Sequence, residues 1–262
     1  RRSRGSIFFN NNRYKESHLA ELRDLYDGAI TYTDDNVGRI LKAVSALELD
    51  ESTIIALTSD HGEALGEHQL FFTHDFTLYD EVLKVPLILR YPGFINPDTV
   101  ITQQVRLIDV APTLLELSNL TPFSRSEGIS LSPLFQGRSL PFLNAFAESA
   151  PRRHMFPEQK RIYFDGNRGK WRMLRTDRWK LIRIPHPEGD RHELYDIVND
   201  PHEKTNLFNE LPGEGLKLAP LLNTWMANDP ERDVDRSSQE NADIKELDPA
   251  AIQQLRTLGY IP

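Results

Sequence analysis

The spacing of apolar residues changes several times in the first half of the chain. Between residues 24 and 47 they recur three and four positions apart, which predicts a helix. Residues 53–58 and 85–90 are instead short continuous apolar runs, typical of strands buried on both faces, as in a parallel sheet. Residues 77–83 predict a short helix between these strands. Strands that alternate with helices indicate an α/β fold.

A further helix is predicted over residues 109–117, with Asp109 as N-cap and a proline in its first turn. The pattern changes near residue 150. Short strand candidates follow, separated by turn signals, and they predict a small antiparallel sheet; they cover residues 161–164, 171–176, 179–184 and 193–197. A polar stretch over 228–246 predicts a loose linker before a last helix at 248–259. We therefore expect three parts, at residues 1–150, 151–228 and 229–262.

Composition narrows the classes of protein that this chain can be. Of its 262 residues 39% are apolar and 27% are charged, which excludes a wholly disordered chain. With 31 Lys+Arg against 39 Asp+Glu the net charge is −8, so a nucleic-acid partner is not expected. The chain has no Cys, which excludes disulfides, thiolate metal sites and a cysteine nucleophile within it. No apolar run approaches the roughly 20 residues of a membrane span.

The stretch from residue 58 to residue 68 contains the most informative chemistry. Asp60 and His61 directly follow a predicted strand, and ligands of open α/β sheets bind beyond the carboxyl ends of strands. Aspartate oxygens and histidine nitrogens are common metal ligands. The alternative interpretation is an N-cap and a polar loop, which the spacing of the pair does not exclude.

Two more histidines, His68 and His74, follow within a few positions. They are typical either of a solvated loop or of an anion pocket, in which a metal and hydrogen-bonding side chains gather on a sulfate or phosphate group. Glu63 and Glu67 count against an anion-binding loop unless their side chains point away from it.

Several ordered motifs resemble the sulfatase family, within the alkaline-phosphatase-like superfamily. The resemblance spans residues 22–207 and corresponds to the later half of the catalytic domain plus the C-terminal subdomain. The motifs are Asp60-His61-Gly62-Glu63, Gly66-Glu67-His68, Leu78-Tyr79-Asp80-Glu81, Val85-Pro86-Leu87-Ile88, Glu193-Leu194-Tyr195-Asp196 and Asn199-Asp200-Pro201. The resemblance implies part of a mixed or parallel sheet flanked by helices, with a small antiparallel C-terminal sheet.

The resemblance also implies sulfate-ester hydrolysis by a formylglycine nucleophile and one divalent cation, usually Ca²⁺. It implies that Asp60 and His61 bind the metal, that His61 alternatively hydrogen-bonds the sulfate, and that His74 binds sulfate or donates a proton. His68 is expected to pack. We expect no formylglycine motif within this chain, and the family's early aspartate pair has no counterpart, because Asp34-Asp35 lies within a helical pattern. We therefore expect a fragment whose nucleophile lies upstream of this chain.

Two alternatives to a sulfatase remain at this point. One is a phosphodiesterase or phosphonate monoesterase of the same superfamily, which would share Asp60 and His61. The other is a non-catalytic metal-binding module. For location, the resemblance implies a periplasmic, secreted or lysosomal protein.

Overall fold

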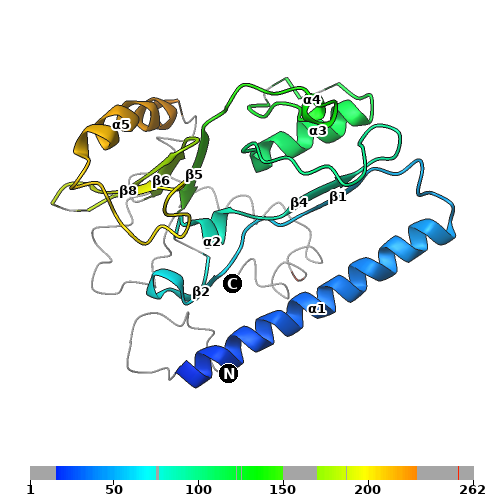
Figure 1. The fold of residues 1–262 in the computed structure, drawn as a ribbon, viewed down its shortest axis with the longest axis horizontal. Helices are drawn as coiled ribbons and strands as arrows, with labels where there is room; N and C mark the ends of the chain where they lie inside the picture. The colour runs from blue at the N-terminus through cyan, green and yellow to red at the C-terminus, as the bar shows by residue number, and fades with distance from the viewer. Residues whose placement is uncertain are drawn as a thin grey trace.

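The computed structural model describes residues 16–74, 77–121, 123–124, 126–149, 170–186 and 188–228, together with Gln253. The described residues form three sheets, which are β1–β4, β2–β3 and β5–β8, and five α-helices. The long first helix, α1, runs along one side of the molecule (Figure 1). Apart from Asn228 and Gln253, the predicted linker and last helix lie outside the described residues, as does the strand candidate at 161–164.

Helix α1 spans Glu16–Ala46, so it begins earlier than the apolar spacing predicted. Its apolar side chains are largely exposed, among them Leu25 at 70% and Ile40 at 63%. Near its first turns, the Arg23 guanidinium donates to the carbonyl oxygen of Leu65 at 2.9 Å. None of the helices among the described residues is long and apolar enough to cross a membrane.

The two apolar runs form strands β1 (Ile55–Thr58) and β4 (Leu87–Arg90), which pair antiparallel with each other. The prediction of strands buried on both faces was wrong for this pair, because alternate residues are exposed, with Ile88 at 60%. The other face packs Leu87 and Leu89 against the apolar cluster around Leu131. Between the two strands lie the hairpin β2 (Ala64–Leu65) and β3 (Phe71–Thr73) and the short helix α2 (Asp80–Leu83).

Helices α3 (Val110–Leu117) and α4 (Ser132–Phe135) lie close to the β1–β4 pair (Figure 1). The predicted helix at 109–117 is confirmed, but Asp109 makes no side-chain cap hydrogen bond to it. Its buried carboxylate instead accepts from the backbone nitrogens of Arg106, at 2.9 Å, and Ile129, at 3.0 Å. Asp109 therefore joins two neighbouring segments rather than capping the helix that follows it.

The C-terminal sheet has four antiparallel strands in sequential order, which confirms the predicted small antiparallel sheet. They are β5 (Ala145–Ser149), β6 (Trp171–Arg175), β7 (Trp179–Ile184) and β8 (Arg191–Asp196). The first of these strands precedes residue 150. Strand β7 has the bounds that its apolar pattern predicted.

Each face of this sheet has its own apolar layer. Leu174, Leu181 and Leu194 pack against helix α5 (Pro212–Ala227). The alternate residues Met173, Ile182 and Tyr195 face the other way and pack against a segment that follows β1; its buried members are Ala64, Leu70, Leu78, Tyr79 and Val82. Because side chains alternate across a strand, the sheet has α5 on one face and the loop after β1 on the other.

Candidate active site

Asp60 and His61 lie just beyond the carboxyl end of β1, as the sequence predicted. The loop closes through local hydrogen bonds. The Ser59 hydroxyl donates to the His61 carbonyl oxygen at 2.7 Å, and the His61 amide donates to the Asp60 carboxylate at 3.0 Å. That amide is the main reason why the pKa of Asp60 is lowered, followed by the charge of the His61 ring. Asp60 is therefore an anionic, exposed carboxylate at neutral pH.

Gly62 fixes this loop against helix α2. Its amide donates to the Val82 carbonyl oxygen at 2.7 Å. A Cβ atom at this position would lie 2.1 Å from the carbonyl oxygen of Glu81, so only glycine allows the approach. The backbone of Asp60 and His61 is thus held by a contact with a segment some twenty residues away.

The donor atoms of Asp60 and His61 suit a divalent cation. The Nε2 atom of His61 lies 3.7 Å from Oδ2 of Asp60, a separation that lets both contact one ion. The other ring nitrogen, Nδ1, lies 2.8 Å from the carbonyl oxygen of Gly62. Because a carbonyl only accepts, this contact places a proton on Nδ1, so Nε2 is the ring nitrogen that could coordinate an ion. Ca²⁺ usually takes six to eight oxygen ligands, so Asp60 would supply only part of its shell, and the His61 nitrogen is an unusual ligand for it.

His74 joins this pair in space. Its ring stacks on that of His61 with 3.9 Å between the centroids and 17° between the planes. Its Nδ1 lies 2.9 Å from Oε2 of Glu63. The structure therefore brings together Asp60, His61 and His74, the three site residues that the resemblance implied.

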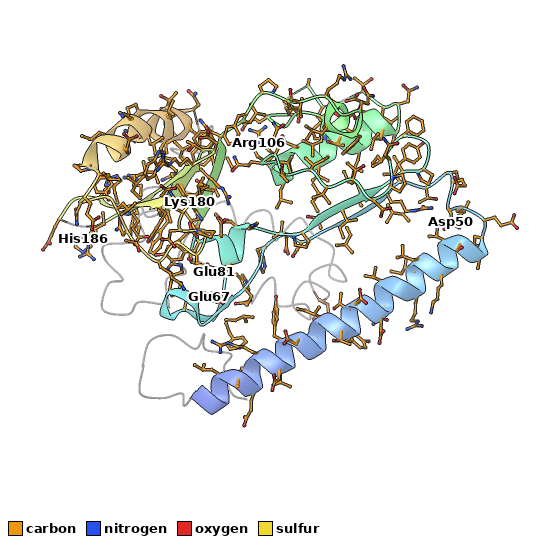
Figure 2. All side chains as sticks on the ribbon, in the orientation of Figure 1. Asp50, Glu67, Glu81, Arg106, Lys180 and His186 are labelled. Atoms are coloured by element: carbon orange, nitrogen blue, oxygen red, sulfur yellow. The ribbon has the colours of Figure 1, made fainter. Side chains whose placement is uncertain are left out.

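His68 lies in a second group, together with Glu81 and Glu203, whose ligand atoms are all within 4.8 Å of one another. Its ring stacks on Tyr79 at 3.7 Å, and burial is the main reason why its pKa is lowered. This group could hold a metal by its residue types, but Nζ of Lys180 already lies 2.6 Å from Oε1 of Glu203. Figure 2 labels Lys180 on the C-terminal sheet and Glu81 on α2. We interpret the group as an ionic cluster between these two elements.

Sequence reasoning missed Glu63, which it considered only as an obstacle to anion binding. Its carboxylate faces His74, whereas Glu67 accepts from the backbone nitrogen of Leu65 at 2.7 Å. The signal that could have found it is the hairpin. Strands β2 and β3 pair Ala64 with Thr73, so residues 63 and 74 are the next opposite positions.

The expectation that this chain contains no formylglycine motif was wrong. The five-residue formylglycine pattern, Cys/Ser-x-Pro/Ala-x-Arg, occurs once here, at Ser149-Ala150-Pro151-Arg152-Arg153. Ser149 is the last residue of β5, paired with Trp171 in the C-terminal sheet, and residues 150–153 lie outside the described part. Ser149 thus belongs to the C-terminal sheet and not to the loop that carries Asp60 and His61, so the match does not change the assignment.

Comparison with known protein families gives two overlapping matches. The sulfatase family model matches residues 5–120, and the model described as N-sulphoglucosamine sulphohydrolase, C-terminal, matches residues 66–219, more than half of the chain. Among characterised relatives, arylsulfatase K of Gallus gallus is 31% identical over 212 residues, which are 80% of this chain and 38% of that protein. N-acetylglucosamine-6-O-sulfatase of Bacteroides thetaiotaomicron is 30% identical over 72% of this chain and 32% of its own length.

Solved structures with a similar fold include a phosphonate monoester hydrolase and a protein bound to a sulfated substrate. The phosphonate monoester hydrolase of Agrobacterium radiobacter superposes with a TM-score of 0.71 at 25% identity, over 83% of this chain and 44% of its own. A protein solved in complex with its substrate D-glucosamine-2-N,6-O-disulfate superposes with a TM-score of 0.63 at 28% identity, over 78% of this chain and 41% of its own. The chain thus spans less than half the length of these relatives. The family matches, the shared fold and the motifs around Asp60 agree. This chain therefore belongs to the sulfatase family, and it corresponds to a C-terminal portion of the alkaline-phosphatase-like fold.

Proposed function

We propose that this chain supplies the metal-binding and sulfate-binding residues of a sulfuric ester hydrolase. The formylglycine nucleophile of that enzyme would come from sequence upstream of this chain. One observation carries the proposal: the donor atoms of Asp60 and His61 are 3.7 Å apart, and the ring of His74 stacks directly on His61. Two candidate ligands for one metal ion thus lie next to His74, a side chain that can donate a proton. Hydrolysis of an anionic ester can use both kinds of group.

Each residue has a distinct task in this proposal. Asp60 and His61 would hold one divalent cation, Ca²⁺, which when bound polarises a sulfate oxygen. His74 would contact the ester and donate a hydrogen bond or a proton to the bridging oxygen as the S–O bond breaks, which is typically worth about 10²–10⁴-fold in rate. The ring of His61 provides a flat surface that limits rotation of His74.

The substrate class follows from the same site and from the relatives. Proteins similar to this chain are named as arylsulfatases and as an N-acetylglucosamine-6-O-sulfatase, so we propose a sulfate ester. The complete protein should hydrolyse an aryl sulfate in a Ca²⁺-dependent way, and faster than a phosphonate monoester or a phosphate diester. A preference for either phosphorus ester would contradict the sulfatase assignment.

A second experiment tests where the nucleophile lies. The 262-residue chain alone should show no turnover of an aryl sulfate with added Ca²⁺. In the complete protein, Ser149→Ala should leave the rate unchanged, because Ser149 belongs to the C-terminal sheet and not to the loop that carries Asp60 and His61. Clear metal-dependent turnover by the isolated chain, abolished by Ser149→Ala, would show that the nucleophile is in this chain after all.

A further inference from the structure

Glu63 and His74 face each other across the base of the β2–β3 hairpin. The pairing of Ala64 with Thr73 makes 63 and 74 the next opposite positions, and Oε2 of Glu63 lies 2.9 Å from Nδ1 of His74. The Glu63 side chain is 16% exposed, and its Oε1 atom is buried without a hydrogen-bond partner among the described residues. Burial of a carboxylate with one oxygen unsatisfied is costly, so stability alone is a weak explanation for this residue.

From this geometry we infer that Glu63 is a positioning residue, which fixes the orientation and tautomer of the His74 ring. A carboxylate only accepts hydrogen bonds, so the contact holds a proton on Nδ1 of His74. The proton that His74 would donate to the ester is then a second one, on Nε2 at the opposite edge of the ring, and it is the doubly protonated ring that supplies it. The His61 ring, stacked at 3.9 Å, restrains the plane of His74, and Glu63 restrains its rotation within that plane.

This inference rests on the proposed role of His74 toward the ester. It assigns no contact between Glu63 and substrate, because Glu63 acts through the imidazole. The competing interpretation is that Glu63 only closes the hairpin. The two differ in how a Glu63 variant combines with a His74 variant, since a residue that acts only through His74 has nothing left to position once that ring is removed.

The experiment is a double-mutant cycle in the complete protein, with Glu63→Leu, His74→Ala and the pair, assayed on aryl sulfates with good and poor leaving groups. We expect Glu63→Leu to lower kcat by about 10–100-fold, mainly for poor leaving groups, with little change in KM. It should have no further effect in the His74→Ala background. Glu63→Gln keeps an acceptor oxygen and should recover most of the rate. The matched control is Glu67→Leu, a nearby carboxylate that bonds Leu65 instead, and its effect should add to that of His74→Ala.

A second measurement separates this inference from the proposed function. In protein labelled with ¹⁵N-histidine, the His74 ring signals should report a proton on Nδ1, and Glu63→Leu should change them while Glu67→Leu should not. Additive effects of Glu63→Leu and His74→Ala, or His74 signals unchanged in Glu63→Leu, would overturn the positioning role while His74 could still act on the ester. Normal activity of His74→Ala, with signals that still depend on Glu63, would overturn the role of His74 and keep the contact.

Discussion

Lys180 and Glu203 form a buried ion pair with 2.6 Å between Nζ and Oε1, and neither side chain is more than 1% exposed. Nζ of Lys180 also lies 2.9 Å from Oδ1 of Asp80, and Oε2 of Glu203 accepts from the Asp80 amide at 2.6 Å. Arg175 pairs with the second oxygen of Asp80. This cluster joins the C-terminal sheet to the helix that holds the Asp60 loop in place.

Lys180→Met should destabilise the protein strongly. The substitution leaves the Glu203 carboxylate buried without its cation, which typically costs about 3–5 kcal/mol. Urea unfolding at neutral pH measures this cost. Lys217→Met is the matched control, because Lys217 forms an exposed pair with Glu214 and should cost less than about 1 kcal/mol. Lys180→Met combined with Glu203→Gln should regain part of the loss, and a Lys180→Met protein of normal stability would refute the cluster's role.

Glu81→Gln should change how stability depends on pH. Burial, with the nearby charge of Glu203, raises the pKa of Glu81 to about 7 from its ordinary 4.5. A raised pKa in the folded state gives a favourable contribution that is complete below about pH 4.5 and is lost as the pH rises through 7. The variant should therefore gain on the wild type between pH 5 and pH 8, by about 1–2 kcal/mol after allowance for partial exposure. Parallel stability curves of the two proteins would contradict the shift.

Asp60→Ala should abolish most of the Ca²⁺ affinity and nearly all activity of the complete protein. The substitution removes the anionic oxygen that a hard cation prefers. Titration calorimetry with Ca²⁺ measures the first effect directly. Asp34→Ala is the control, because Asp34 is an exposed residue of α1 and should leave both properties intact. Unchanged Ca²⁺ affinity in Asp60→Ala would show that the metal binds elsewhere.

Gly62→Ala should displace the loop that carries Asp60 and His61. Its Cβ would meet the Glu81 carbonyl oxygen at 2.1 Å, and such overpacking costs about 1–3 kcal/mol. We expect lower thermal stability and weaker Ca²⁺ binding together. Gly28→Ala, in α1 with nothing within 4 Å of the new atom, should instead stabilise by about 0.5–1 kcal/mol. Equal effects of the two variants would argue against the close approach.

His74→Ala should show a dependence on the leaving group. If His74 assists departure of the alcohol, the loss should reach about 10²-fold or more with alcohols of high pKa and stay small with nitrophenyl esters. Steady-state kinetics on both substrate types measures the difference. A similar loss with both would restrict His74 to sulfate binding, and no loss with either would remove it from the site.

The sequence alone determined those features that depend on neighbouring residues. The turn signals that flank β7 were enough to predict its bounds, and the continuous apolar run before Asp60 was enough to place Asp60 and His61 at the end of a strand. Both are local properties, because side-chain direction in a strand and the end of a strand are set by a few consecutive residues.

Only the tertiary structure decided how distant segments meet. No local signal distinguishes an antiparallel from a parallel partner for β1, or a charged strand residue that faces solvent from one that is fully buried, as Lys180 is. The contact between Glu63 and His74 likewise depends on the register of a hairpin, and the stack of His61 on His74 depends on where that hairpin folds back. These relationships arise from strand pairing and burial between distant segments. Their free energy depends on which side chains meet in the fold, and the spacing of residues along the sequence does not identify those partners.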